Sequence, residues 1–264
     1  MILQTVVRDC LYLNWALPVS SVPPAPAPLR YDMHRWQDGE VVFVSALLFR
    51  QDRLHLPRIP LVRLSYPQFN LRLYVIDDDG VPAVLFRAML VPAWVVPSMR
   101  VVADQPAQSG QFDYPRPSRT PADEEWRWQV RRGGELRVVA RQQTPCPGYG
   151  PSLGSWERLT RFFNQRRRGY FEGPAGLKRV DASHEASAFW PLEAEVEADS
   201  LLDSCLPLAD AVWPPPHSAF LCPEIPFVFE LGEADDRAVS HAPPPVAADP
   251  ATFGAARCLG RSAA

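Results

Sequence analysis

Four arginines placed in apolar segments are the residues of this sequence whose chemistry stands out first. Arg50, Arg72, Arg87 and Arg100 each lie in, or at the end of, an apolar run with the character of a β-strand. Burying an isolated guanidinium costs several kcal/mol, so a single arginine of this kind more often extends along a sheet to solvent. Two or more arginines that converge in an interior would need an anion between them. A carboxylate ligand held by the planar guanidinium is then the natural chemistry.

The segment 66–75 would position one of these arginines. Apolar and polar residues alternate along it with the period of a strand that has two different faces. The apolar set is Phe69, Leu71, Leu73 and Val75, and the polar set is Asn70, Arg72 and Tyr74. We predict that the polar face contacts a small ligand, although alternation alone leaves open which face lines an interior. The predicted ligand-binding residues are Asn70, Arg72, Tyr74, Arg100 and His184, the last as a proton carrier.

The sequence contains none of the common short motifs for nucleotide binding, zinc proteolysis or serine hydrolysis. The histidines at positions 34, 55, 184, 217 and 241 do not have the spacing of metal ligands, so we predict no metal site and no cofactor. The acidic run Asp77-Asp78-Asp79-Gly80 lacks the alternating ligand positions of a calcium-binding loop. We interpret it as a turn.

The composition argues against several classes of protein. A chain of 264 residues with a net charge of −3 is not expected to present a general nucleic-acid-binding or anionic-membrane surface. No apolar window approaches the ~20 residues of a membrane span, and residues 1–17 lack the pattern of a signal peptide. The five cysteines are widely spaced, which favours reduced thiols over a disulfide framework. We predict a soluble, cytoplasmic protein, whose oligomeric state the sequence leaves open.

Short strands joined by tight turns make up most of the predicted secondary structure. We expect a first strand at 8–17, followed by a proline-rich connection. The segments Asp38-Gly39, Asp77-Asp78-Asp79-Gly80 and Gly133-Gly134 each separate two strand patterns, as the turn of a β-hairpin does. Further strands are expected at 177–181, 188–196 and 225–231, and residues 104–125 are expected to form a long excursion.

One principal helix is predicted at about residues 152–170. Trp156, Leu159 and Phe163 recur with helical spacing, and Ser152 or Ser155 can cap the first turn. The arginines 166–168 suit a helix C-terminus, where cations meet the negative end of the dipole. The predicted fold is therefore mostly β (α+β), with one antiparallel barrel or sandwich-like domain at 1–232. The Ala/Pro-rich residues 233–264 are predicted to form a disordered tail.

The strand motif Pro67-x-Phe69-Asn70-x-Arg72-x-Tyr74-Val75 resembles that of the YqjF-like bacterial family of unknown function (family 2071). Weaker landmarks agree with it, among them the hairpin at Asp38-Gly39, Pro97 before Arg100, Ser152-Leu153, and Trp190-Pro191-Leu192 after His184. The resemblance covers roughly residues 8–205. His184 and Trp190 lie further apart than in the family pattern.

The resemblance implies the fold of acetoacetate decarboxylase, a mostly antiparallel β-barrel enzyme that uses a lysine as a Schiff-base nucleophile. At the place implied for that lysine, after Pro97, this sequence has Ser98-Met99, and Asn70 stands where a pocket glutamate is implied. Lys178 is the only lysine of the chain, and its polar context predicts a surface position. Schiff-base decarboxylation is therefore disfavoured.

Three functions remain open at this point. The leading prediction is a barrel that binds a small carboxylate or ketone, with or without catalysis. The second is a non-catalytic structural or interaction protein with a packed barrel core, which Arg50, Arg72 and Arg87 all pointing outward would favour. The third is a decarboxylase-type lyase that uses Lys178.

Overall fold

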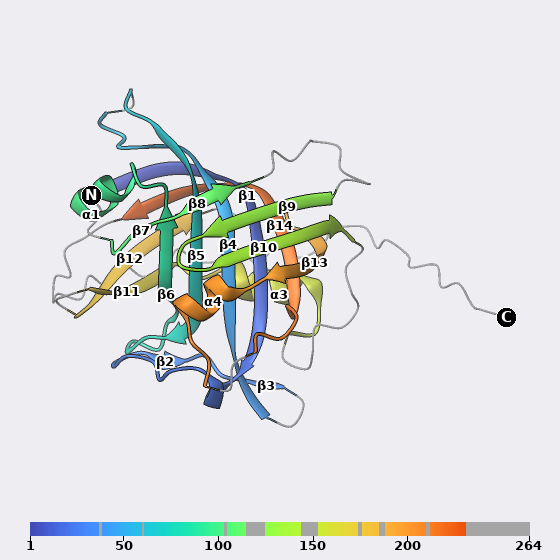
Figure 1. The fold of residues 1–264 in the computed structure, drawn as a ribbon. Coiled ribbons are helices and arrows are strands. Elements are labelled where there is room, and N and C mark those ends of the chain that lie inside the picture. Colours follow the sequence, from blue (N-terminus) through green and yellow to red (C-terminus); the bar gives the residue numbers. More distant parts are fainter. Residues whose placement is uncertain are drawn as a thin grey trace, which may run out of the picture. The chain divides into compact units, whose positions relative to one another are not determined.

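The strands of the computed structural model form a closed ring with a second layer on one side of it (Figure 1). The structure describes residues 1–36, 39–59, 61–102, 105–114, 125–143, 153–173, 176–184, 188–209 and 212–230. All of them belong to one compact unit, Met1–Ala234. The predicted tail at 233–264 lies outside the described residues.

The elements have the following bounds. The strands are β1 (Ile2–Pro18), β2 (Arg30–Tyr31), β3 (His34–Trp36), β4 (Gly39–His55), β5 (Leu64–Ile76), β6 (Pro82–Val91), β7 (Gln108–Ser109), β8 (Gln111–Asp113), β9 (Glu125–Arg131), β10 (Glu135–Gln142), β11 (Arg168–Gly173), β12 (Gly176–His184), β13 (Trp190–Ala198) and β14 (Ser218–Glu230). The helices are η1 (Val19–Ser21), α1 (Val96–Val102), α3 (Trp156–Asn164) and α4 (Ser200–Cys205).

Within the described residues, the ring runs in the order β1, β4, β5, β6, β11, β12 and β14, and β14 pairs back to β1. The first part of β14 also pairs with β13, from which β10, β9 and β8 continue as the second layer. Most pairings are antiparallel, but β6 pairs in parallel with β11 and with β7. The mostly-β, barrel or sandwich-like prediction is confirmed, and the sheet is mixed where we expected only antiparallel strands.

The predicted hairpins pair as expected. β3 pairs with β4, β5 with β6, and β9 with β10, each pair antiparallel. Gly80 and Gly133 have φ angles of +78° and +63°, a conformation that glycine adopts without steric cost, at two of the three turns. The Asp77 carbonyl accepts the Gly80 N–H at 3.0 Å, which confirms the interpretation of the acidic run as a turn. Residue 38 of the remaining turn lies outside the described residues.

The predicted helix is shorter than expected. The Ser155 side chain caps α3 by accepting the Arg158 N–H, but the helix ends at Asn164 instead of continuing to residue 170. From Arg168 the chain is strand β11, which pairs with β6. Gly169 permits this pairing, because a Cβ there would lie 2.6 Å from the Phe86 ring. Arg166, just beyond the helix, does donate from Nε to the Phe162 carbonyl of its last turn at 3.2 Å, as predicted for a cation at the C-terminus, whereas Arg168 belongs to the strand.

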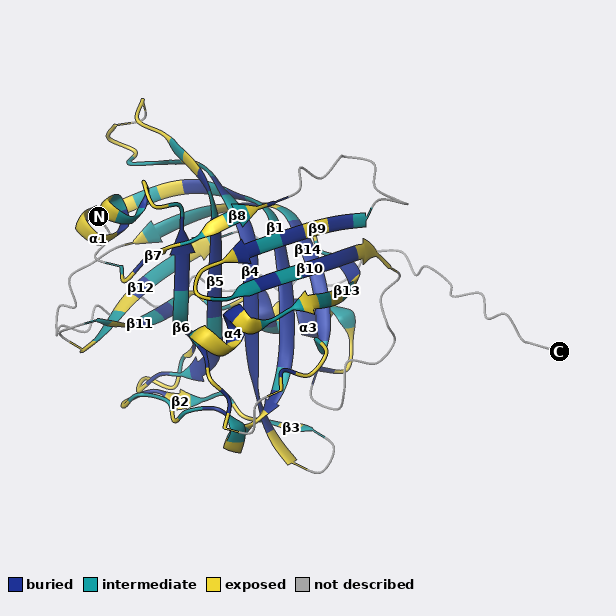
Figure 2. Cartoon of the chain, viewed as in Figure 1, coloured by how far each residue is buried: buried dark blue, intermediate teal, exposed yellow. Residues whose placement is uncertain are grey.

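The two faces of the ring strands are buried in different ways (Figure 2). The outer faces of β1, β4 and β5 pack against the second layer in a core rich in leucine, valine and tryptophan. The inner faces surround a smaller cluster completed by α3, in which Phe163 contacts the rings of Phe43, Tyr74 and Phe220. Phe69, Leu71, Leu73 and Val75 belong to the outer core. Asn70, Arg72 and Tyr74, with the opposite alternation, therefore face the interior.

Of the predicted excursion at 104–125, the structure describes residues 105–114, which contain the short strands β7 and β8, and Glu125, which begins β9. The described residues contain three short helices that the sequence analysis did not predict, namely η1, α1 and α4. Met99 and Arg100 lie in α1, so the expectation that they belong to a strand is wrong.

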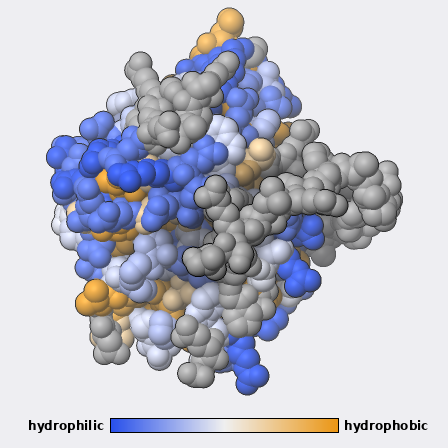
Figure 3. All heavy atoms as spheres, turned by 90° about the vertical axis from the view of Figure 1, so that its right-hand side faces the viewer, coloured by the Kyte–Doolittle hydropathy of each residue, from blue (hydrophilic) through white to orange (hydrophobic). Residues whose placement is uncertain are grey.

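The outward face of the second layer is charged. Glu125 pairs with Arg127 and Arg141, and Arg137 pairs with Glu135, on strands β9 and β10. Hydrophilic residues cover much of the described surface in Figure 3. None of the helices in the described ranges has the length and apolar character needed to cross a lipid bilayer.

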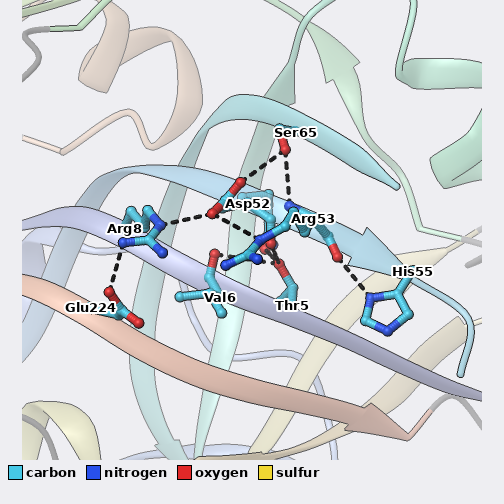
Figure 4. A network of polar contacts seen from close by, with 9 residues as sticks. Thr5, Val6, Arg8, Asp52, Arg53, His55, Ser65 and Glu224 are labelled. Carbon is cyan, nitrogen blue, oxygen red and sulfur yellow. Dashed lines mark hydrogen bonds and ion pairs between the residues drawn. The ribbon is translucent and has the colours of Figure 1, made fainter. Parts of the chain in front are cut away.

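Two bulges shift the strands next to the interior. Asp9 and Arg53 have φ angles of +52° and +54°, where the β1–β4 and β4–β5 registers shift. A bulge of this kind re-aims the side chains that follow it. Arg8 fastens the bulged region by hydrogen bonds to Asp52 at 2.8 Å and Glu224 at 2.6 Å, so that β1, β4 and β14 are tied together (Figure 4).

This network predicts a pH dependence of stability. Burial raises the pKa of Asp52, but hydrogen bonds from Arg8 and Ser65 and the charge of Arg8 outweigh it, so the pKa lies below its ordinary value. A carboxyl group whose pKa is lowered by folding stabilises the protein above its unfolded pKa, and that stabilisation disappears as the pH falls through the folded pKa. We expect Asp52→Asn to lower the free energy of unfolding by about 0.2–1 kcal/mol at pH ~7. In urea unfolding, the difference from the wild type should shrink below pH ~4; an equal difference at both pH values would contradict this role.

Candidate functional site

A cavity of about 120 Å³ lies inside the ring. Its polar wall comes from neighbouring strands β4 and β5, through Gln51, Gln68, Asn70 and Arg72. The lining residues of β6, β12 and β14 are all apolar. They are Val84, Phe86, Met89, Val180, Ala182, Ile225, Phe227 and Phe229. The aromatic cluster around α3 fills the adjoining part of the interior. The site is thus a small, largely apolar chamber with a polar side on β4 and β5. Further polar lining groups are Gln105, Arg166, Arg167 and Arg168.

The Arg72 guanidinium stands where the cavity meets the aromatic cluster. Its Nη2 donates to the Tyr74 hydroxyl at 3.0 Å and to the Phe163 carbonyl in the last turn of α3 at 2.8 Å. Its Nε also donates to the Tyr74 hydroxyl, at 3.2 Å. The Cζ atom lies 5.3 Å from the centre of the Tyr12 ring and 5.4 Å from that of Tyr74. These contacts fix the guanidinium at the cavity wall.

Arg72 has no counter-charge among the described residues. No carboxylate forms an ion pair with it, and the side chains that act on it most strongly are Tyr74, Tyr12 and Cys10. Burial raises the pKa of the Cys10 thiol and of the Tyr12 phenol well above their ordinary values, so both groups are neutral near neutral pH. A partly buried positive charge without an anion is costly unless a ligand or solvent compensates it.

On the side away from the cavity, Arg72 is the first donor in a chain of hydrogen bonds. Because the Tyr74 hydroxyl accepts from Arg72, its own hydrogen donates to Ser45 Oγ at 2.9 Å. Ser45 Oγ in turn donates to Asn14 Oδ1 at 2.5 Å, and Asn14 Nδ2 donates to Ser218 Oγ at 3.1 Å. Every acceptor in this buried chain is satisfied, which rigidifies such networks. The chain therefore orients Arg72 toward the cavity.

A second chain ends at Asn70. Thr5 Oγ1 lies 2.9 Å from Gln51 Oε1, Gln51 Nε2 lies 3.4 Å from Gln68 Oε1, and Gln68 Nε2 lies 2.9 Å from Asn70 Oδ1. The Asn70 carbonyl is thereby used within the protein. Its Nδ2 remains as a donor on the same strand face as Arg72. A guanidinium and an amide N–H that share one wall form a suitable site for the oxygens of a carboxylate.

The structure brings together only part of the predicted site. Asn70 and Arg72 line the cavity, and Tyr74 lies directly behind Arg72. Arg100 does not line the cavity; it is exposed on α1, with its Nε donating to the Ala107 carbonyl. His184 lies at the end of β12, where its ring is 4.7 Å from that of Phe227, and it is not a lining residue.

The other basic residues considered in the sequence lie elsewhere. Arg50 donates to the Tyr114 carbonyl, and Arg87 pairs with the exposed Glu172 at 2.6 Å. Neither lines the cavity, so of the four strand arginines considered in the sequence only Arg72 does, and the alternative of several arginines converging there is not realised. Lys178 lies on β12 opposite Phe171 and is half-buried, also outside the cavity lining.

Sequence reasoning missed several lining residues. Gln68 alternates in phase with Asn70 and could have been found by extending the polar face by one position. Met99 could not have been found in this way, because it reaches the cavity from α1. Arg166 was missed because it was assigned to a helix end. The Arg166 Nη2 atom pairs with Asp32 at 2.7 Å, and its guanidinium lies 4.4 Å from the centre of the Phe162 ring.

The family assignment rests on nearly the whole described domain. A family model, DUF2071, described as "Uncharacterized conserved protein (COG2071)", matches residues 4–226. The chain belongs to the DUF2071 family. The resemblance identified from the motif at 67–75 is therefore confirmed. No curated protein matches the sequence of this DUF2071 member.

Solved structures similar to this DUF2071 protein include an enduracididine biosynthesis enzyme and an acetoacetate decarboxylase-like enzyme. The enduracididine biosynthesis enzyme MppR, complexed with the condensation product of pyruvate and imidazole 4-carboxaldehyde, has a TM-score of 0.59 at 10% identity, covering 87% of each chain. MppR with HEPES buffer bound has a TM-score of 0.56 at 12% identity, covering 88% of this chain and 86% of that one. An acetoacetate decarboxylase-like enzyme from Sphingomonas wittichii RW1 has a TM-score of 0.51 at 13% identity, covering 86% and 89%. At these identities the similarity establishes the fold.

Proposed function

We propose that this DUF2071 protein binds a small organic anion, in particular a carboxylate, in the cavity of its ring. The observation that carries the proposal is the Arg72 guanidinium, held at the cavity wall with no carboxylate partner among the described residues. Asn70 Nδ2 supplies a second donor beside it. The similar enzyme MppR has been solved with pyruvate and with the condensation product of pyruvate and imidazole 4-carboxaldehyde, which agrees with a small carboxylate as ligand.

The proposal does not include Schiff-base chemistry. Lys178 is the only lysine of the chain, and it is not a lining residue of the cavity. Met99, at the place where the family resemblance implies the enzyme's lysine, contributes an apolar thioether side chain to the wall. Binding through Arg72 and Asn70 therefore needs no covalent step.

Thermal unfolding of the full chain tests the proposal. Small carboxylic acids of different sizes would be compared with their primary amides, which have nearly the same shape and no charge. A ligand that binds the folded state raises the midpoint by mass action, by an amount that increases with concentration. We expect at least one acid, but not its amide, to raise the midpoint in a saturable way. If no acid does so at millimolar concentration, the packed-core structural protein becomes the better interpretation.

A further inference from the structure

The two sides of the cavity differ in a way that bears on the kind of anion it would hold. Strands β12 and β14 lie across the ring from β4 and β5, because β1 separates the two pairs on one side and β6 and β11 on the other. The lining residues of β12 and β14 are Val180, Ala182, Ile225, Phe227 and Phe229. The part of a ligand that faces away from Arg72 therefore meets only hydrocarbon on these strands.

The other arginines at the cavity do not offer a second anion site of the same kind. Arg166 is paired with Asp32 through Nη2, which offsets its charge, although its buried Nη1 has no hydrogen-bond partner among the described residues. Arg168 is paired with Asp77 and Asp79, at 2.7 and 2.8 Å. Arg167 is exposed to solvent. Arg72 is thus the lining arginine of the described residues that is both partly buried and without a carboxylate.

The size of the cavity limits the body of the ligand. Its volume is about 120 Å³, and an apolar cavity of ~150 Å³ is known to hold benzene. One six-membered ring or a short branched chain would occupy it. A second charged group that pointed toward β12 and β14 would lose its hydration against apolar side chains, because these two strands contribute no polar side chain to the lining, and this is strongly unfavourable.

We propose that the ligand is an amphipathic monocarboxylate, with its acid group at Arg72 and Asn70 and an apolar body against β12 and β14. This inference rests on the proposed function and specifies its ligand class. Ala182 is the specificity-determining residue, because it is the smallest lining side chain on the apolar wall apart from Gly169 and leaves the space that the body would fill.

Matched ligands distinguish the contribution of the acid group to binding from that of the apolar body. Benzoate, benzamide and terephthalate share one ring and differ in charge, and hexanoate and adipate share one chain length. Binding to the full chain would be measured by titration calorimetry and thermal unfolding. We expect benzoate and hexanoate to bind at least ~10-fold more tightly than acetate, because each buried methylene contributes about 0.8 kcal/mol. Terephthalate and adipate should bind at least ~100-fold more weakly than benzoate and hexanoate.

Variants on β12 test the location of the apolar body. Ala182→Leu should weaken benzoate at least ~10-fold by filling the space and should leave acetate unchanged. Ser183→Leu is the matched control, because Ser183 is exposed on the other face of the same strand and should leave both ligands unchanged. Should Ala182→Leu fail to fold, the comparison of ligands on the unmodified protein still decides the question.

The outcomes distinguish this inference from the proposed function. Equal or tighter binding of adipate or terephthalate would overturn the apolar-body inference and leave the anion site in place. The same holds if only acetate-sized acids bind, or if Ala182→Leu affects acetate and benzoate equally. If no carboxylate binds, both proposals fail together.

Discussion

Arg72→Ala should remove carboxylate binding by this DUF2071 protein, with a loss of at least ~30-fold in affinity for whichever acid the unmodified chain binds. Arg72 is the cavity arginine of the described residues that is partly buried and without an acidic partner, so its removal leaves a carboxylate bound at this wall with the Asn70 amide alone. Titration calorimetry with the acid and its amide measures the effect. Unchanged affinity for the acid would show that the anion binds elsewhere.

The contacts of Arg72 complicate this variant in a defined way. Arg72 also donates to Tyr74 and to the Phe163 carbonyl, so we expect Arg72→Ala to lower the free energy of unfolding by about 1–3 kcal/mol. Arg87→Ala is the control, because it removes an arginine of the neighbouring strand that does not line the cavity, and it should leave binding unchanged.

Asn70→Asp tests the same site without removing Arg72. The aspartate has the shape of asparagine and can still accept from Gln68 Nε2, but it places a carboxylate beside the guanidinium. We expect a folded protein that is at least as stable as the unmodified chain and no longer responds to carboxylates. A variant that still binds the acid with full affinity would exclude Asn70 as a neighbour of the bound anion.

Phe163→Ala is expected to have the largest effect on stability. Phe163 is fully buried in α3, and its ring packs against those of Phe43, Tyr74 and Phe220 inside the ring of strands. Truncating a buried phenylalanine costs about 3–5 kcal/mol through lost burial and the cavity left behind. Urea unfolding followed by fluorescence or circular dichroism measures the change.

The matched control for this variant is Leu61→Ala. Leu61 is 95% exposed, so its removal should change the free energy of unfolding by no more than ~0.5 kcal/mol. A loss below ~1 kcal/mol for Phe163→Ala would mean that the interior collapses around the missing ring and that α3 is not the element that fills it.

The periodicity of the sequence was sufficient for much of the fold. The alternation at 69–75 correctly separated Phe69, Leu71 and Leu73 from the polar residues, because a strand exposes successive side chains to opposite environments. The turns at Gly80 and Gly133 were equally visible, since few residues other than glycine adopt positive φ angles easily. The end of the helix could not be predicted from the local sequence, because the residues after it pair as β11 with β6, a strand about 85 positions earlier in the chain.

The candidate site divides along the same line. Asn70, Arg72 and Tyr74 could be grouped from sequence because they share one face of one strand. The sequence could not show which arginine lacks an acidic partner, because these partners come from distant positions in the chain. Glu172 pairs with Arg87, and Asp32 pairs with Arg166. The sequence by itself indicated most of the long strands, the two faces of β5 and the family. Only the tertiary structure decided which polar face lines the cavity and which charge there is uncompensated, because both depend on closing the ring.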